Sequence, residues 1–426
     1  MTSASSGREA VAAVWRIESA RIVGALARYT GDVSLAEDLA QEALAEALVT
    51  WPRDGVPRHP AGWLLTVGRR RAIDAFRRRS ALDDRYAAFA RDLGEGGAAT
   101  GGPPPGPSAD LPWDPDAIDD DVLALMFVAC HPALSREARV ALTLRVVGGL
   151  SSDEIARAFL VPTATVQARI TRAKKTLAAA RVPFAVPPAA ERPARLGSVL
   201  NVLYVIFTEG STASSGDALI RVDLAGEATR LARVLARLVP ESAETHGLLA
   251  LLELTSARFP ARLAPDGTPV LLHDQDRRRW DHAAITRGRA ALTRATHTAP
   301  GLGPYALQAS IAECHALAPS VEATDWPRIV RLYEALNHLT PSPVVTLNHA
   351  VALSMSEGPA TALPLVEALI RDDALPTSHH LPAVHAELLT RLDRPTEARA
   401  ALERALARCH NEPERVLLRD RLGALR

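Results

Sequence analysis

The stretch SSDEIARAFLVPTATVQARITRAKK, residues 151–175, carries two short helical patterns separated by a turn. Ser151 and Glu154 have the S-x-x-E spacing of a capping box, in which the two side chains accept hydrogen bonds from backbone N–H groups that the first turn leaves unpaired. Pro162 stands where a second helix should begin, because the first turn of a helix does not use the N–H that proline lacks. This pattern predicts a helix-turn-helix.

The second helix of this motif separates apolar side chains from polar and basic ones. Val166, Ile170 and Ala173 recur at helical spacing and are expected to face inward. A short helix with a polar and basic outer face fits the major groove of DNA, whereas the alternative is a solvated basic helix in an ordinary bundle. The side chains expected on the outer face are Thr165, Gln167, Arg169, Arg172, Lys174 and Lys175.

The composition indicates an all-α protein in which any DNA contact is local. The 426 residues carry a formal net charge of +0, so a generally basic surface is excluded, and their number predicts several domains. Hydrophobic residues make up 47% and aromatic residues 4%, and alternating runs of β-branched residues are scarce, which favours helices. The sequence lacks an apolar run of transmembrane length and a signal-peptide pattern, so we expect a cytoplasmic protein without a membrane partner.

The cysteines predict neither a disulfide framework nor a metal site. The sequence contains an odd number of cysteines, which are widely spaced: Cys130, Cys314 and Cys409. It contains no C-x-x-C motif. Each is followed by a histidine, but adjacent Cys and His residues are poor joint ligands on a helix. We therefore expect buried structural thiols, no metal and no cofactor.

The chain divides into helical zones separated by segments rich in proline and glycine. Residues 8–91 are helical, and residues 92–121 are first rich in Gly and Pro and then acidic, as expected of a flexible linker. Residues 122–181 are helical again and contain the helix-turn-helix. After a Pro-rich break at 182–193, helical periodicity runs through 194–426.

The last zone contains an internal repeat. Residues 349–369 align with 385–405 at an offset of 36, which places His349 on His385, Pro359 on Pro395, Ala362 on Ala398 and Glu367 on Glu403. A period in the thirties with small residues at the helix contact is typical of stacked helix pairs such as tetratricopeptide (TPR) units. Residues 225–260 are interpreted as a third, more diverged unit. Such solenoids bind peptides or other proteins on a concave face.

The N-terminal zone begins with an amphipathic helix at 34–50, followed by a turn at 51–59. Its sequence alternates small apolar and acidic residues at helical spacing, which predicts one buried and one exposed side. The buried side is expected to carry Leu35, Leu39, Ala43, Leu44 and Ala47, and the exposed acidic side Asp38, Gln41, Glu42 and Glu46.

A second helix, HPAGWLLTVGRRRAIDAFRRR at 59–79, carries two arginine clusters about two helical turns apart. A single cluster is usually a solvated face, but two clusters beside an exposed aromatic turn suit phosphate contact and base stacking on opened DNA. The core-like side chains are Trp63, Leu64, Val67, Ile73 and Phe76, and the clusters are Arg69, Arg70, Arg71 and Arg77, Arg78, Arg79.

These motifs, in this order, resemble the extracytoplasmic-function (ECF) sigma factors of bacterial RNA polymerase. AEDLAQEALAEAL (36–48) is similar to their region 2.2, PAGWLLTVGRRRAIDAFRRR (60–79) to regions 2.3–2.4, and residues 134–177 to region 4. LYVIFTEGSTASSGD (203–217), HDQDRRRWD (273–281), TDWPRIVRLYEAL (324–336) and LNHAVALSMSEGP (347–359) resemble the subgroup that carries a C-terminal TPR-like extension.

The sequence departs from the family pattern at two places. Arg70 stands where many members have Asn, which affects the detail of −10 readout. Thr208 and Ser211 replace the Asn and Tyr expected around Glu209 and Gly210.

The resemblance implies a non-enzymatic, all-α protein that binds core RNA polymerase and directs promoter recognition and opening. It implies a σ2 helical bundle at 8–91, a linker at 92–121, a σ4 helix-turn-helix domain at 122–181 and a TPR-like α-solenoid at 194–426. The expected partners are promoter DNA and core polymerase, through its β′ clamp helices and β flap.

The resemblance also implies roles for individual residues. Asp38, Gln41 and Glu42 match the motif that docks on the β′ clamp helices. The turn at 51–59 matches the loop that captures a flipped −10 base. Expected −10 contacts are Arg53, Arg58 and His59 for the base and Arg69, Arg71, Arg77 and Arg78 for the strand backbone; expected −35 contacts are Gln167 and Arg169 for base edges and Thr163, Thr165, Arg172 and Lys174 for phosphates.

The acidic run Asp119, Asp120 and Asp121 would follow the connector's path through the polymerase near the RNA exit route, or else solubilise the linker. The fused C-terminal domain, residues 194–426, is expected to pack on σ2 and σ4 and to set whether the polymerase-binding face is available. A small YCII-like (DGPF) protein is a candidate partner because the family is associated with such proteins in genomes.

Polar residues of the C-terminal zone form a candidate ligand or interdomain site, with buried salt bridges between repeats as the preferred alternative. Glu209 with His273 or His282 is the nearest approach to a catalytic pair. The candidate residues are Glu209, Asp274, Gln275, Asp276, Arg277 and Asp281.

Two other functions remain open at this point. A stand-alone helix-turn-helix regulator with a TPR-like sensor domain explains 151–175 but not the motifs at 37–79. An enzyme fused to a DNA-binding head would need a catalytic constellation that the sequence does not argue for strongly.

Overall fold

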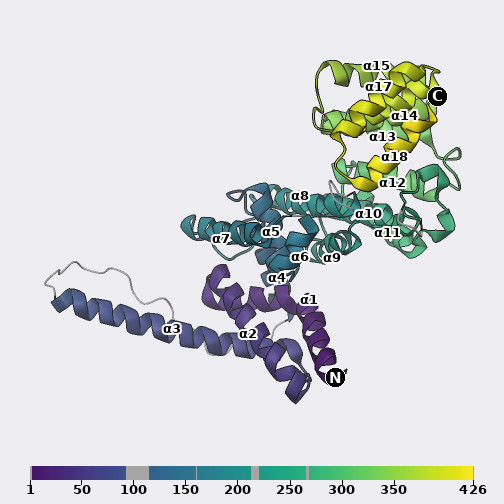
Figure 1. Ribbon diagram of the computed structural model, residues 1–426. Helices are drawn as coiled ribbons and strands as arrows, with labels where there is room; N and C mark the ends of the chain where they lie inside the picture. Colours follow the sequence, from purple (N-terminus) through teal and green to yellow (C-terminus); the bar gives the residue numbers. More distant parts are fainter. Residues whose placement is uncertain (1, 93–114, 160, 213–219, 265–267, 426) are drawn as a thin grey trace. The chain divides into compact units, whose positions relative to one another are not determined.

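A computed structural model of the chain describes residues 2–92, 115–159, 161–212, 220–264 and 268–425 (Figure 1). Within these residues the elements are helical apart from one isolated bridge between Leu263 and Pro269, which confirms the predicted all-α class. The chain divides into two compact units, residues 1–202 and 203–426. No helix in the described residues is long and apolar enough to cross a membrane.

The first unit begins with helices α1 (Thr2–Thr30), α2 (Val33–Asp54) and α3 (Pro60–Asp92). Asp32 caps α2 by accepting hydrogen bonds from the backbone N–H groups of Ser34 and Leu35, at 2.7 and 3.1 Å. Ile22, Leu26 and Leu64 are almost completely buried where the three helices meet. On the predicted buried face of α2, Leu39, Ala43 and Ala47 are buried, whereas Leu35 and Leu44 are half-buried.

The structure differs from the expected turn at 51–59, because α2 continues through Trp51 to Asp54. The Trp51 side chain is only 2% exposed and packs edge-on against Trp63, with ring centroids 5.6 Å apart. Burial of this large aromatic ring stabilises the additional helical turn. The turn is therefore shorter than predicted, and its aromatic residue is not available for base stacking.

Four further helices complete most of the first unit: α4 (Pro115–Ala129), α5 (Arg136–Val146), α6 (Ser152–Phe159) and α7 (Thr163–Ala179). The capping box of α6 is confirmed, since Ser151 N donates to Glu154 Oε2 at 2.7 Å and Glu154 N donates to Ser151 Oγ at 3.1 Å. Pro162 is the N-cap of α7. The inward face of α7 is confirmed, because Val166, Ile170 and Ala173 are all buried.

Helix α4 begins inside the segment that we expected to be a linker. Asp121, which we expected in an acidic connector, is buried on α4 and its carboxylate lies 3.3 Å from Arg28 of α1. A buried carboxylate needs a charged partner, so this pair fixes the end of the connector against the bundle. Residues 93–114, the rest of the predicted linker, lie outside the described residues.

Helix α8 (Arg192–Ser211) contains the boundary between the two units. Its first half contacts the end of α4 and α5, where Ser198 Oγ donates to the Cys130 carbonyl at 2.8 Å and accepts from Arg139 at 2.7 Å. The predicted break at 182–193 therefore ends where α8 begins.

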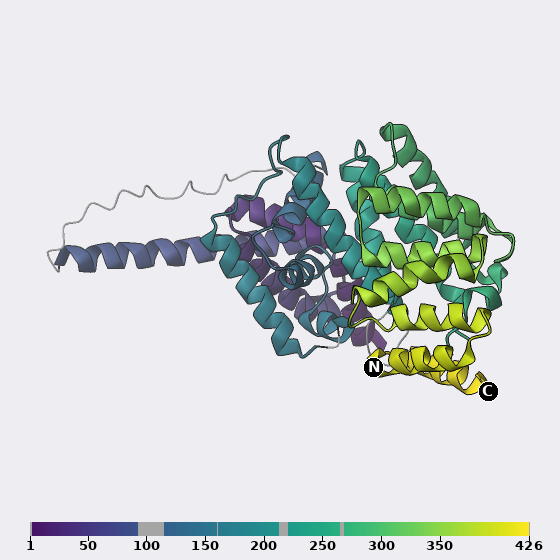
Figure 2. The ribbon, with the colours of Figure 1, turned by 90° about the horizontal axis from the view of Figure 1, so that it is seen from above.

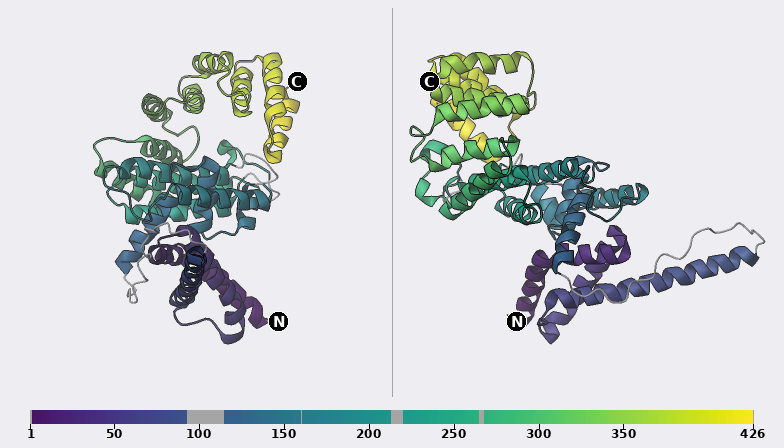
Figure 3. Two further views of the ribbon diagram at one scale, coloured as in Figure 1. Left: turned by 90° about the vertical axis from the view of Figure 1, so that its left-hand side faces the viewer. Right: turned by 180° about the vertical axis from the view of Figure 1, so that it is seen from behind.

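The second unit continues with successive helices, of which α10 and α11 are separated by the longer stretch 257–281 with three 3-10 turns (Figures 1 and 2). The end-on view shows the later helices following one another along a curve (Figure 3, left). The bounds are α9 Val222–Leu238, α10 Ala243–Ser256, α11 His282–Thr298, α12 Pro304–Leu317, α13 Trp326–Leu339, α14 Pro343–Ser356, α15 Pro359–Arg371, α16 His380–Arg391, α17 Pro395–Arg408 and α18 Glu412–Ala424, with the short 3-10 turns η1 Phe259–Ala261, η2 Leu272–Asp274 and η3 Arg277–Arg279.

The helix pairs follow the predicted repeat. The two aligned prolines, Pro359 and Pro395, are the first residues of α15 and α17. Ala362 and Ala398, which the repeat places at the same position, are both 0% exposed. Small side chains at these points allow the helix backbones to approach closely. The diverged unit expected at 225–260 corresponds to α9 and α10.

Candidate nucleic-acid and polymerase interface

The outer face of α7 carries the residues that we expected to contact DNA. Gln167 and Arg172 are exposed, whereas Thr165 and Arg169 are half-buried. Arg169 and Arg172 line a pocket of about 390 Å³ between α7 and the start of α5. The hydroxyl of Thr163 already has a hydrogen-bond partner, because it donates to Asp153 at 2.8 Å.

Lys174 departs from the expected pattern, since it does not point freely into solvent. Its side chain is only 16% exposed, and its Nζ donates to Glu37 at 2.6 Å and to Asp38 at 3.0 Å. Both carboxylates belong to α2, in the part of the chain expected to dock on polymerase. A predicted DNA-binding residue and a predicted polymerase-binding residue therefore contact each other.

Glu37 is the centre of this contact and was not predicted from the sequence. Its side chain is 5% exposed and also accepts from Arg145 Nε on α5 at 2.9 Å. Burial alone would raise the pKa of Glu37, but the attraction of Lys174 and Arg145 holds that pKa below its ordinary value. The available signal was its position, because Glu37 lies among the buried residues Ala36 and Ala40 of α2.

A second set of contacts joins α1 to the start of the helix-turn-helix. Trp15 Nε1 donates to the Gly149 carbonyl at 3.1 Å, and Arg16 pairs with Glu154 at 2.9 Å. Gly149 has φ +71, and a Cβ there would lie 2.4 Å from Ser19 Oγ. Only glycine meets both requirements, the positive φ and the close approach of α1.

The other residues expected to dock on polymerase are also partly engaged. Gln41 lines a groove of about 460 Å³ that α1, α2 and the helix-turn-helix share. Glu42 is exposed, but its carboxylate lies 3.3 Å from Arg71 of α3. Asp38 keeps 66% of its side chain exposed despite the contact with Lys174.

The first arginine cluster of α3 serves the fold as well as presenting charge. Arg71 bonds Glu46 at 2.8 Å, and this hydrogen bond raises the pKa of Arg71. Arg70 also lies 3.1 Å from Glu46, and Arg69 is half-buried. In the second cluster, Arg77 and Arg78 are exposed, whereas the side chain of Arg79 lies outside the described residues.

A pocket of about 470 Å³ lies between α1 and the turn that precedes α3. Arg58 and His59, two of the expected −10 contacts, line this pocket beside Val14 and Ile17. Ile17 is 67% exposed, and the acidic Glu18 also lines the pocket, so apolar, basic and acidic side chains face the same space. Arg53 is exposed near the end of α2.

The polar residues singled out in the C-terminal zone have structural partners of their own. Glu209 bonds Arg221 at 2.5 Å, Asp274 pairs with His273, and Asp276 pairs with Arg278. These basic partners explain the positions of the three carboxylates, so no bound ligand has to be invoked for them.

Other residues of the same segment stabilise the loops between helices. Arg277 donates to the carbonyls of His315 and Ala318 at 2.7 and 2.8 Å and lies over the Trp280 ring at 4.6 Å. Gln275 donates to Val270 O at 3.0 Å, and Asp281 caps α11. His273 pairs with Asp274 at 3.2 Å, and Glu209 pairs with Arg221.

Comparison with known families matches three successive segments of the chain. Residues 16–81 match the family described as Sigma-70 region 2, and residues 124–177 match Sigma-70, region 4. Residues 195–296 match a family of unknown function, DUF6596. The chain therefore contains a Sigma-70 region 2 and a Sigma-70 region 4, in this order, followed by this third domain.

Relatives show how far each similarity extends. An uncharacterized protein of Rhizobium meliloti is 43% identical over 416 residues, which cover 95% of this chain and 93% of that protein. The chain belongs to the same family as this full-length relative. A probable ECF RNA polymerase sigma factor, SigI of Mycobacterium tuberculosis, is 28% identical over 44% of this chain, and the match spans 61% of that protein. The sigma factor SigK of Mycobacterium ulcerans is 27% identical over 40% of this chain and 84% of that protein.

Proposed function

We propose that this protein is an alternative-type sigma factor that binds core RNA polymerase, recognises and opens promoters, and exists as a free chain in a closed state. The observation that carries the closed state is the cluster of Glu37, Asp38, Arg145 and Lys174. The order of the two sigma regions supports the function itself.

Polymerase docking is assigned to Asp38, Gln41 and Glu42 of α2, which would contact the β′ clamp helices, while the helix-turn-helix domain would contact the β flap. In the free chain Lys174 contacts Asp38, and Arg71 contacts Glu42. Polymerase would have to replace these intramolecular ion pairs. Such exchange is favourable only if the polymerase offers basic groups of its own, as a complementary interface does.

Promoter contact is divided between the two sigma regions. Arg58 and His59 line a pocket whose volume of about 470 Å³ is sufficient for an extruded base. Gln167 and Arg169 would read base edges in the major groove, and Thr163, Thr165, Arg172 and Lys174 would hold phosphates. Arg53 would contact the same extruded base, and Arg69, Arg71, Arg77 and Arg78 would hold the backbone of the −10 strand.

The closed state and the DNA-bound state exclude each other at Lys174. One ammonium group cannot lie 2.6 Å from Glu37 and bind a DNA phosphate at the same time. Arg145 holds the same carboxylate at 2.9 Å, so opening would expose two cations and one anion together. Binding of polymerase to α2 would therefore release α7 for DNA.

The C-terminal unit is proposed to be a TPR-like regulatory domain that sets how readily the sigma regions are used. The repeated helix pairs α14–α15 and α16–α17, with equivalent alanines at 0% exposure, support this classification. A small YCII-like (DGPF) protein is the candidate partner implied by the family resemblance.

The decisive experiment measures binding of the full-length protein to core RNA polymerase. The Asp38→Arg, Glu42→Arg variant should lose binding, although Asp38→Arg also repels Lys174 and so favours opening. Asp54→Arg, on the same helix but outside the docking set, is the matched control and should bind as wild type does.

Three results would separate the candidate functions. Loss in the double variant alone supports a sigma factor docking through α2. Equal binding by all three proteins would remove α2 from the interface. Absence of binding by wild type and by a variant that opens the Glu37 cluster would favour a stand-alone regulator, which requires only operator DNA.

A further inference from the structure

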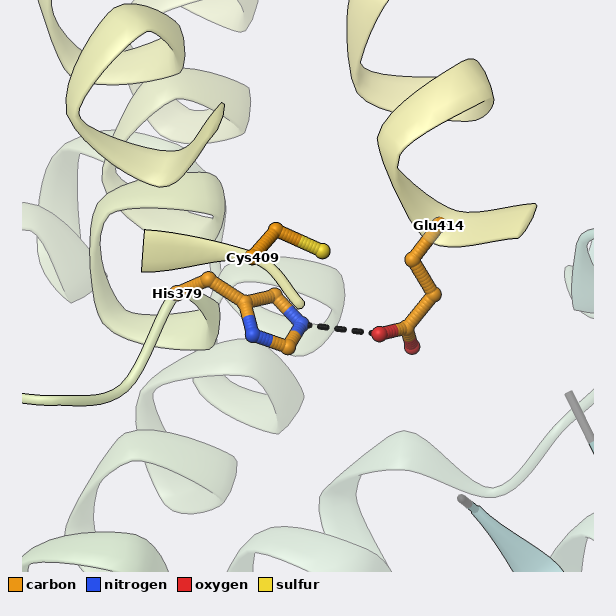
Figure 4. Close-up of side chains that lie close together, drawn as sticks. All are labelled: His379, Cys409 and Glu414. Carbon is orange, nitrogen blue, oxygen red and sulfur yellow. Dashed lines mark ion pairs between the residues drawn. The ribbon is translucent and has the colours of Figure 1, made fainter. Parts of the chain in front are cut away.

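Three potential metal ligands meet at the C-terminal end of the second unit, where helices α16, α17 and α18 adjoin (Figure 4). His379 is the N-cap of α16, Cys409 is the C-cap of α17, and Glu414 lies in the first turn of α18. Their nitrogen, sulfur and oxygen atoms all lie within 4.8 Å of one another. Figure 4 shows the three side chains directed into the same space.

His379 and Glu414 already face each other in this cluster. The Nε2 atom of His379 lies 3.0 Å from Glu414 Oε2, so a nitrogen donor and a carboxylate oxygen are directed at the same place (Figure 4).

Cys409 brings a soft donor to the same place. The residue is 0% exposed, and its Sγ has only a weak partner, Asn411 O at 3.5 Å. The His379 and Glu414 side chains are 17% and 18% exposed, so an ion could reach the cluster from solvent without unfolding the helices.

The backbone around Cys409 is held in place independently of these side chains. Asn411 caps α18 by accepting from Glu414 N at 3.2 Å. Arg415 donates to the carbonyls of Leu406 and Cys409 at 3.1 and 2.9 Å. A ligand set mounted on fixed helix ends loses little conformational entropy when an ion binds.

We propose that His379, Cys409 and Glu414 form a zinc(II) site with its fourth position open to water. A histidine nitrogen, a cysteine thiolate and a carboxylate are all zinc ligands, and sulfur disfavours magnesium and calcium. Tetrahedral zinc keeps its ligand atoms about 3.5 Å apart, so the widest separation here has to close by about 1 Å. Bound zinc would tie α16, α17 and α18 together.

This site revises the expectation that the cysteines are only structural. The expected burial is confirmed, because Cys130, Cys314 and Cys409 are all buried free thiols. The sequence could not reveal the site, since His379 lies 30 residues before Cys409 and its own neighbour His410 is not part of the cluster.

The test uses full-length protein freed of metal with a chelator and then titrated with Zn²⁺ against a chromogenic competitor. Co²⁺ serves as the spectroscopic probe, because a cysteine ligand produces a thiolate-to-cobalt charge-transfer absorption. Wild type should bind one equivalent and show this absorption. Cys409→Ser should lose the absorption and bind zinc more than about tenfold more weakly.

Cys314→Ser is the matched control, because Cys314 is also buried in the second unit but lies outside the cluster. Glu414→Gln keeps the thiol and should weaken binding while retaining the charge-transfer band, which covers the case in which Cys409→Ser does not fold. The simpler alternative is a His379–Glu414 ion pair, with the charge of Glu414 also facing Arg262.

Absence of zinc binding by wild type, or an unchanged cobalt spectrum in folded Cys409→Ser, would overturn the proposal. Neither measurement depends on transcription, so the result is independent of the proposed sigma function.

Discussion

Two helix contacts in this molecule use opposite chemistry. The contact of α2 with α5 and α7 is centred on charges, with Glu37 between Arg145 and Lys174. The stack of α14 to α18 is centred on small apolar side chains such as Ala350, Ala362, Ala398 and Ala401. Charged groups that separate regain their hydration, which offsets the lost attraction. Apolar surfaces that separate have no such compensation, and each Å² of newly exposed surface costs about 25 cal/mol of free energy. The first contact is therefore suited to opening, and the second to remaining closed.

The largest effect should come from placing a charge in the apolar stack. Ala398→Asp would bury an unpaired carboxylate at a 0% exposed position, so the free energy of unfolding should fall by more than about 4 kcal/mol. Chemical denaturation measures this loss. Ala400→Asp, on the exposed face of the same helix, should change stability by less than about 0.5 kcal/mol. Similar losses in both variants would mean that α17 is not held by its buried face.

Acid should also destabilise the second unit through His315, which lies on α12 outside the stack of α14 to α18. Burial first, and then Arg258 and Arg277, lower the pKa of His315 to about 4. The unfolded chain takes up this proton near pH 6.5 and the folded chain only near pH 4, so stability falls as pH drops through that window. The loss should reach about 3 kcal/mol at most.

The matched variant for this measurement is His315→Phe, which keeps a ring against Trp326. Its unfolding free energy should depend less on pH between 6.5 and 4 than that of wild type. Parallel pH profiles would exclude His315 as the source. The Glu37 contact should lose stability only at lower pH than His315 begins to. Because the pKa of Glu37 is lowered in the folded chain, the contact keeps its full stabilising effect until the pH falls below 4.5, the ordinary pKa of a glutamate.

A smaller effect is expected from weakening the charged contact itself. Glu37→Gln removes the anion that Arg145 and Lys174 share, and should destabilise the closed state by about 2 kcal/mol. This loss is smaller than for a fully buried ion pair, because both cations retain some exposure. Polymerase affinity should rise more than about tenfold if closure competes with docking.

Arg145→Gln removes a cationic partner of Glu37 and changes no residue that is predicted to bind DNA or polymerase. It should also raise the affinity for polymerase. Glu46→Gln is the control, since Glu46 bonds the arginines of α3 and lies outside the cluster. Unchanged affinity in both Glu37→Gln and Arg145→Gln would show that the contact does not restrain docking.

The smallest effect concerns the start of the helix-turn-helix. Ser151→Ala removes the hydroxyl that accepts from Glu154 N at 3.1 Å and should cost about 1 kcal/mol. Thermal unfolding of the first unit measures it. Ser152→Ala, one residue later and without a capping bond among the described contacts, should be nearly neutral. A larger loss in Ser152→Ala would contradict the capping assignment.

What the sequence predicted and what it missed follow from the range of the interactions. Ser151, Glu154 and Pro162 act within one or two helical turns, so their pattern identifies the motif without knowledge of the fold. The repeat that aligns Ala362 with Ala398 is likewise local within each helix pair. Helical spacing and capping therefore sufficed for the fold class and for the inward face of α7.

The missed features depend on residues distant in sequence. Lys174 and Glu37 are separated by 137 positions, and Asp121 is buried because Arg28 of another helix lies beside it. Trp51 was expected in an exposed turn, but its contact with Trp63 extends α2. Periodicity cannot reveal such pairs, since each residue alone has the composition of a solvated surface or turn.

The ion pairs of Lys174 have a consequence for how salt would act on promoter binding. Each cation that meets a DNA phosphate normally displaces a condensed counterion, which gives affinity a steep dependence on ionic strength. Lys174 begins with Glu37 and Asp38 as its counter-charges, and salt that weakens its phosphate contact also weakens this internal pairing. The two effects offset each other, so promoter affinity would vary less with ionic strength than the number of basic residues on α7 suggests.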